Sequence, residues 1–173
     1  MLIEVTGDIL LSKAHAIAHG VAPNDHMDRG LALALRERWP AMAKDFRHYC
    51  HVQSADSGSA WTWKSSDGLF IISLLTQEAA ASEKAHPGKA KIEHVNHALR
   101  ELRSIVAKEK ITSLALPRLA TGLGGMDWTK VQPLVKQHLG DLDIPVFVYA
   151  TYHPHQAADE ARAAGAHAKH LRS

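Results

Sequence analysis

Short apolar runs alternate along this chain with longer segments in which apolar residues recur every three or four positions. The runs at residues 2–6, 14–21, 69–76, 111–117 and 144–149 have the length of strands, and most are too continuously apolar to have one face in water. The clearest helical stripe lies within residues 89–108, and we expect all of its apolar residues in the core. They are Ile92, Val95, Leu99, Leu102, Ile105 and Val106. Strands that alternate with helices predict an α/β fold, a three-layer α/β/α domain around a mixed, mostly parallel sheet.

Turn and helix-end signals place the remaining elements. Residues 61–63 alternate as an edge strand does, and the turn residues at 64–68 connect them to the run at 69–76, which we expect to be a central strand. This hairpin and the first strand argue against an all-parallel sheet. A helix over 31–38 should end before Pro40, which can begin the next helix. We expect one domain over residues 1–152 and an alanine-rich helical tail over residues 153–173.

Composition narrows the function classes. A net charge of +2 and a pI near 8.7 are too balanced to predict nucleic-acid binding through bulk charge, so a ligand requires a defined site. No apolar run reaches the roughly 18 residues of a membrane span. The single cysteine, Cys50, excludes an intramolecular disulfide and favours a packing thiol in a cytoplasmic protein. The 13 histidines have no carboxylate or cysteine at a metal-binding spacing, so we expect no metal and no cofactor.

One glycine-rich loop stands where an anion site is expected. Residues 121–125, TGLGG, follow the apolar run at 111–117 and precede Asp127, which is a good helix N-cap. Free amides and a helix N-terminus at the carboxyl end of a strand bind anions. The pattern is neither a P-loop nor a full dinucleotide fingerprint, so a plain turn is the alternative. The polar loop at 22–30 also ends in a glycine before a helix, which suggests a second anion site.

Three segments together resemble a macro domain. They are residues 5–10 (VTGDIL), the loop from 18–20 (AHG) to 30–32 (GLA), and residues 116–128, in the order and at the spacing of that family. The resemblance covers about residues 1–151. Among macro domains it is greatest to the branch that holds the terminal ADP-ribose protein glycohydrolase and the DNA ADP-ribosyl glycohydrolase antitoxin.

The resemblance implies an ADP-ribose site. Asp8, beside Ile9, stands where the family binds the adenine amino group, and a carboxylate can accept a hydrogen bond from that group. Tyr149 or Tyr152 would stack on adenine. The first substrate loop maps onto residues 24–31 and includes Arg29, Gly30 and Leu31. The diphosphate loop maps onto Ala120, Thr121, Gly122, Leu123, Gly124, Gly125 and Met126.

The catalytic groups of that branch are replaced here. Gln77 stands where the branch has a lysine that attacks the ribose, and the partner acid aligns with Gly124. A lysine further along the same segment (Lys84, Lys89 or Lys91) is a possible substitute. We expect instead that Asp28 or Glu78 activates or orients a water at the distal ribose, in a pocket shaped by Asn24 and His26.

These expectations define a function and its alternatives. The first is a monomeric hydrolase that removes or processes ADP-ribosyl groups, with ADP-ribose or ADP-ribosylated protein or nucleic acid as partner and no membrane. A phosphatase acting on ADP-ribose 1″-phosphate, with His26 as the acid, is a related option. The second class is a binding module that reads ADP-ribose, or another nucleotide, without turnover.

Overall fold

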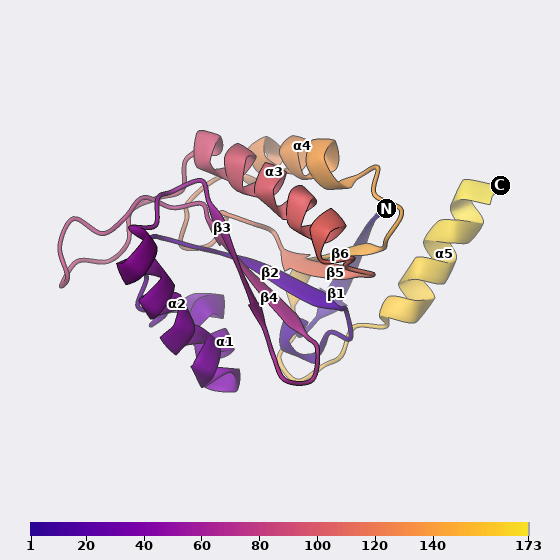
Figure 1. Cartoon of the computed structure of the whole chain (residues 1–173). Coiled ribbons are helices and arrows are strands. Elements are labelled where there is room, and N and C mark those ends of the chain that lie inside the picture. Colours follow the sequence, from indigo (N-terminus) through magenta and orange to yellow (C-terminus); the bar gives the residue numbers. More distant parts are fainter. Residues whose placement is uncertain (173) are drawn as a thin grey trace.

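A six-stranded sheet forms the middle layer of the computed structural model, which describes residues 1–172 (Figure 1). The strands are β1 (Leu2–Gly7), β2 (Ala16–Val21), β3 (Ala60–Lys64), β4 (Phe70–Leu75), β5 (Leu114–Pro117) and β6 (Val146–Tyr152). Their order in the sheet is β1-β6-β5-β2-β4-β3. Every neighbouring pair is parallel except β3 with β4. The predicted mixed, mostly parallel sheet is confirmed.

The first strand corrects one expectation. It was expected to help break the parallel pattern, but β1 pairs with β6 in parallel, with Leu2 opposite Val146. The antiparallel contribution comes from the edge hairpin alone, where Trp61 lies opposite Ser73. The strand over 69–76 lies next to this edge, and all six residues of β4 are buried. The predicted strand at 111–117 begins later, at Leu114.

Helices cover both faces of the sheet. Figure 1 shows α3 (Ile92–Lys108) and α4 (Trp128–Leu139) above it, and α1 (Gly30–Arg38) and α2 (Pro40–Gln53) below. Pro40 begins α2 as predicted. The stripe of α3 is buried through Val95, Leu99, Leu102 and Val106. Ile92 was expected in the core, but it lies in the first turn of α3 and is 37% exposed.

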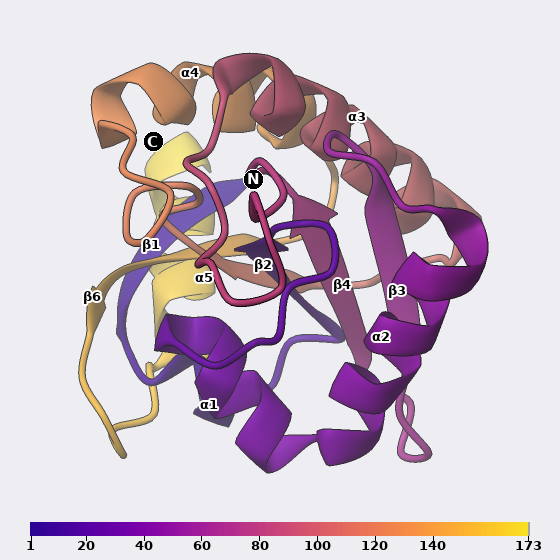
Figure 2. The same cartoon turned by 90° about the vertical axis from the view of Figure 1, so that its left-hand side faces the viewer.

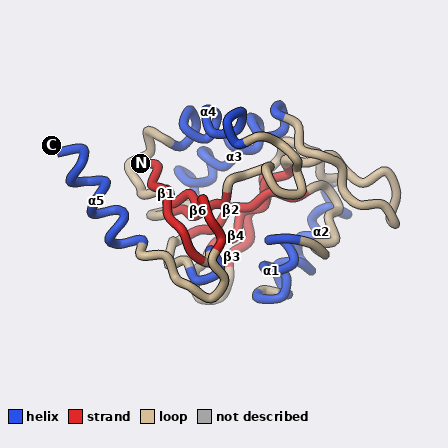
Figure 3. Tube along the Cα trace, turned by 180° about the vertical axis from the view of Figure 1, so that it is seen from behind, coloured by secondary structure: helices blue, strands red, loops and turns tan. Residues whose placement is uncertain are grey.

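The C-terminal helix α5 (Glu160–Arg172) lies beside β1, apart from the other helices (Figures 1 and 3). Ala163 and Ala164 pack against the apolar cluster that contains Ile3 and Val5. The domain boundary at residue 152 stays a prediction, but the chain after it contacts the sheet.

Other predictions concern the molecule as a whole. No helix within residues 1–172 is both long and apolar enough to cross a bilayer. The same residues hold no cluster of three or more His, Cys, Asp or Glu side chains arranged for a metal ion. Cys50 is 3% exposed, and burial raises the pKa of its thiol, which fits a packing role.

Candidate functional site

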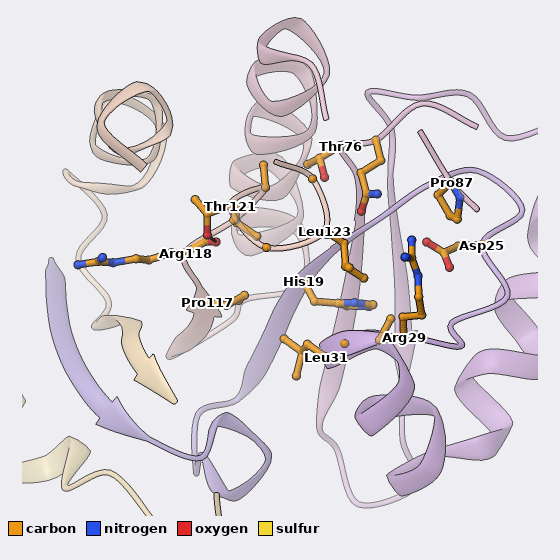
Figure 4. Close-up of a pocket in the computed structure, with 18 of the residues that line it drawn as sticks. His19, Asp25, Arg29, Leu31, Thr76, Pro87, Pro117, Arg118, Thr121 and Leu123 are labelled. Carbon is orange, nitrogen blue, oxygen red and sulfur yellow. Dashed lines mark hydrogen bonds between the residues drawn. The ribbon is translucent and has the colours of Figure 1, made fainter. Parts of the chain in front are cut away.

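A cavity of about 680 Å³ lies at the carboxyl ends of β2, β4, β5 and β6. Figure 2 looks onto this end of the sheet, with the loops before α1 and α3 in front of the strands. Two loops, at residues 25–32 and 117–124, form its opposite sides, and strand ends form its floor (Figure 4). In open parallel sheets this is the edge at which ligands bind.

The loop before α1 is held in shape by Asp25. Its two carboxylate oxygens accept hydrogen bonds from the amides of Ala22 (3.0 Å) and Met27 (2.9 Å). Met27 is 1% exposed and anchors the loop in the core against α2. The loop therefore delivers Arg29 and the first amides of α1 to the cavity, and these amides have no partner within the helix.

The two loops that form the sides of the cavity approach each other closely at Gly30. Gly30 has φ +60°, a left-handed conformation that side chains rarely adopt. A Cβ at this position would lie 3.2 Å from Cδ1 of Leu123 in the opposite loop. Glycine at position 30 therefore permits both the entry into α1 and the approach of Leu123.

The glycine-rich loop presents amides to the cavity. It is closed by hydrogen bonds from the amide of Met126 to the carbonyl of Ala120 (2.9 Å) and from Gly125 to Gly122 (3.1 Å). Within the described chain, the amides of residues 121–124 donate no hydrogen bond. Asp127 then caps α4 by accepting from the amide of Thr129 (2.9 Å), as predicted. Residues whose amides have no hydrogen-bond partner therefore line both sides of the cavity, an arrangement suited to a diphosphate.

The floor of the cavity contains a buried histidine. His19, near the end of β2, is 1% exposed, and its Nε2 lies 2.9 Å from Oγ of Ser73 on β4. Thr76, which directly follows β4, is fully buried. Its Oγ1 lies 2.9 Å from where a Cβ of Gly20 would be, so glycine at position 20 makes room for this hydroxyl.

Burial should make His19 a source of pH-dependent stability. Desolvation lowers the pKa of His19 from 6.5 to about 4. Between these two pH values the unfolded chain binds more protons than the folded protein. The stability that neutral, buried His19 provides is therefore complete above about pH 6.5 and is lost as the pH falls toward 4. We expect up to about 3 kcal/mol of the free energy of unfolding to disappear over this window. Urea unfolding of the wild type and of His19→Gln at pH 4.5 and pH 7 checks this. Equal pH dependence in both proteins would contradict it.

The structure brings many of the predicted site residues together. Those that line the cavity are Asp28, Arg29, Gly30, Leu31, Ala120, Thr121, Gly122, Leu123, Gly124, Tyr149 and Tyr152. Those that lie outside its lining are Asp8, Ile9, Asn24, His26, Glu78, Gly125 and Met126. Both loops are therefore where the sequence placed them, while most of the expected catalytic side chains are not in the cavity.

Asp8 makes its hydrogen bonds outside the lining of the cavity. It is 3% exposed, and its carboxylate accepts hydrogen bonds from the amides of Leu10 and His155, each at 3.0 Å. The amide of Asp8 donates to the carbonyl of Gln156 (2.7 Å). Asp8 therefore fastens the chain after β6 to the end of β1, and in this conformation both of its oxygens are occupied.

The aromatic candidates for stacking differ in exposure. Tyr149 is 6% exposed, and its hydroxyl donates to Oε2 of Glu160 on α5 (2.8 Å). Tyr152 is 59% exposed at the end of β6. Only Tyr152 has a ring that is accessible to a base.

The segment after β4 is tied down by its polar residues. Nε2 of Gln77 donates to the carbonyl of Gly88 (3.0 Å), so the residue at the expected lysine position fastens the loop. Glu78 pairs with Lys91, at 2.6 Å between Oε1 and Nζ. Neither Lys84, Lys89 nor Lys91 lines the cavity, so none of these lysines replaces the missing nucleophile in this conformation.

Sequence reasoning missed the floor of the cavity. His19, Gly20 and Thr76 line it together with Asp25 and Arg118. The available signal was a polar residue near the end of an otherwise apolar strand, as at His19 in AIAHGV and Thr76 in LFIISLLT.

Comparison with known proteins agrees with this geometry. The macrodomain of Thermus aquaticus DarG superposes with a TM-score of 0.75, at 22% identity, over 87% of this chain and 98% of that domain. The fold is that of a macro domain. No protein-family model matches the chain.

Curated proteins to which this chain is similar carry the names of the expected branch. The DNA ADP-ribosyl transferase-DNA ADP-ribosyl glycohydrolase fusion protein of Thermosipho africanus is 28% identical over 158 residues, which cover 84% of this chain and 40% of that protein. The ADP-ribose glycohydrolase OARD1 of Homo sapiens is 24% identical over 146 residues, which cover 84% of this chain and 88% of that protein. The macro domain thus spans less than half of the fusion protein. The resemblance stated from the sequence is confirmed.

Proposed function

We propose that this macro domain binds ADP-ribose and hydrolyses the bond that joins an ADP-ribosyl group to its acceptor. The observation that carries the proposal is the pair of loops with unpaired amides that line opposite sides of the cavity, with Arg29 among the lining residues. Amides and a guanidinium bind a diphosphate well because both donate hydrogen bonds to anionic oxygens. The names of the two curated relatives, both glycohydrolases, support the hydrolytic reaction.

The acceptor and the cellular setting belong to the same proposal. The relatives are named for DNA ADP-ribosyl glycohydrolase and ADP-ribose glycohydrolase activity, so ADP-ribosylated DNA and ADP-ribosylated protein are both substrates to test. A monomer in the cytoplasm is proposed from the balanced composition and the single cysteine.

Calorimetric titration with ADP-ribose, together with mass spectrometry of ADP-ribose released from modified protein and DNA, tests the proposal. We expect micromolar binding of ADP-ribose, with a binding free energy of about −8 kcal/mol, and release of ADP-ribose from at least one substrate. Failure to bind ADP-ribose would contradict the site assignment. Binding without release from any substrate would contradict the hydrolase.

A second candidate is a reader that binds ADP-ribose without turnover. It is favoured by the engagement of Gln77 with Gly88 and by the absence of any side chain at Gly124, the two positions at which the resemblance expects catalytic groups. The phosphatase alternative has less support, because His26 lies outside the cavity lining.

Asp28 is the acidic residue to test first, because it lines the cavity and is exposed there. We expect Asp28→Ala to slow release of ADP-ribose about tenfold while affinity for ADP-ribose changes little, since a carboxylate that orients water acts on the reaction more than on binding. Release assays and calorimetry on the variant check this, with Glu78→Ala as the control outside the cavity. Unchanged release by Asp28→Ala would remove Asp28 from the reaction.

A further inference from the structure

Three buried polar atoms of residues that line the cavity lack a hydrogen-bond partner among residues 1–172. They are Nδ1 of His19, Oγ1 of Thr76 and Nε of Arg118. A buried polar atom without a partner costs about 1–3 kcal/mol. An unpartnered atom in the lining of a cavity, as Nδ1 of His19 is, indicates a place where a polar group of the ligand or a reacting water is received.

The ring of His19 is oriented by the neighbouring strand. His19 lies opposite Ser73 in the register of β2 and β4, and its Nε2 is 2.9 Å from the Ser73 hydroxyl. In the tautomer whose Nε2–H donates to Ser73, Nδ1 carries a free lone pair. Figure 4 shows the ring between Leu31 of α1 and Leu123 of the glycine-rich loop. The ring therefore lies between the two sides of the site.

The neighbouring polar side chains hold their own loops or point away from His19, and a guanidinium cannot accept a proton. The carboxylate of Asp25 holds two amides of its own loop, and Gln77 donates to Gly88. Arg118 extends away from His19 in Figure 4 and lies over the ring of Trp128, 5.5 Å from its centroid. His19 thus offers a buried proton acceptor where these neighbours do not.

We propose that His19 is a catalytic residue of this site, as the group that accepts a proton from the hydrolytic water. The assignment rests on the proposed hydrolase function. The water oxygen bonds to the anomeric carbon of the ribosyl group as its proton passes to Nδ1, and the bond from that carbon to the acceptor breaks with its electron pair on the acceptor. The imidazolium then returns the proton to the acceptor or to solvent.

Matched histidine variants test the assignment. His138 is also buried, and its Nε2 lies 2.7 Å from Oδ1 of Asn96, but it lies outside the cavity lining. His19→Gln is expected to slow release of ADP-ribose about 100-fold, the lower range of acid–base catalysis, and to keep ADP-ribose affinity within about threefold. His138→Gln is expected to match the wild type in both.

The outcomes separate this assignment from the proposed function. Release by His19→Gln at the wild-type rate, or a loss of binding as large as the loss of release, overturns the catalytic role of His19 and leaves the hydrolase standing. Absence of release by the wild type from every substrate overturns the hydrolase, and the role of His19 with it. If His19→Gln does not fold, nitrogen NMR of the wild-type histidines decides. A shift of the His19 Nδ1 signal on adding ADP-ribose, with His138 unchanged, supports the assignment, and no shift at His19 overturns it.

Discussion

Gly124→Ala is expected to weaken ADP-ribose binding about 1,000-fold while the domain stays folded. A Cβ at Gly124 would lie 2.6 Å from the carbonyl oxygen of Ala120, which is a backbone atom and cannot rotate away. The loop would have to open, and the amides of residues 121–124 would no longer converge on one anion. Losing two hydrogen bonds to a charged diphosphate costs about 4 kcal/mol, which corresponds to that loss of affinity. Calorimetric titration with ADP-ribose measures it, and thermal melting monitors the fold.

Gly122→Ala is the matched control for this loop. The same methyl group at Gly122 meets no atom within 4 Å, so the loop keeps its shape and affinity should remain within about threefold of the wild type. Wild-type affinity in both variants would mean that the loop does not bind the diphosphate. An equal loss of affinity in both variants would mean that any side chain in the loop blocks the ligand. The clash with the Ala120 carbonyl would then not be the cause of the weaker binding.

Local patterns in the sequence were sufficient for the elements and for the two loops. Buried strands are continuous apolar runs, α3 shows a stripe of helical spacing, and Asp127 marks a helix start through a bond to a residue two positions away. Each of these signals is local, because a strand, a helix or a cap is determined by residues close together in the chain.

The features that the sequence did not reveal depend on distant residues. The direction of β1 follows from its pairing with β6, which is the last strand of the chain. The engagement of Asp8 depends on His155, 147 residues away. His19 became a site residue only when β4 placed Ser73 beside its ring and Thr76 at the same floor. No periodicity contains this information, because strand order decides which side chains become neighbours.

Asp8→Ala is expected to lower the free energy of unfolding by about 4 kcal/mol, because it removes the charged acceptor of two partly buried hydrogen bonds. The donors are the amides of Leu10 and His155, the second of which belongs to the segment that leads to α5. For a domain of this size the loss corresponds to a fall in melting temperature of about 8–16 °C. Asp127→Ala is the control, because Asp127 also accepts a hydrogen bond from a backbone amide, at the start of α4, but is exposed, and its loss should cost only about 1 kcal/mol. Thermal and urea unfolding of both variants measure the difference.

The same variant decides between two uses of the Asp8 carboxylate. The resemblance to macro domains assigns this carboxylate to the adenine amino group, whereas in the structure its oxygens hold Leu10 and His155. If the carboxylate serves only to hold Leu10 and His155, Asp8→Ala loses stability but keeps an affinity for ADP-ribose within about threefold of the wild type. The affinity is measured under conditions in which the variant is fully folded. If affinity falls tenfold or more under those conditions, the carboxylate reads adenine, and the segment after β6 must release Asp8 when the ligand binds. Loss of affinity without loss of stability would show that the bond from His155 contributes little to the fold.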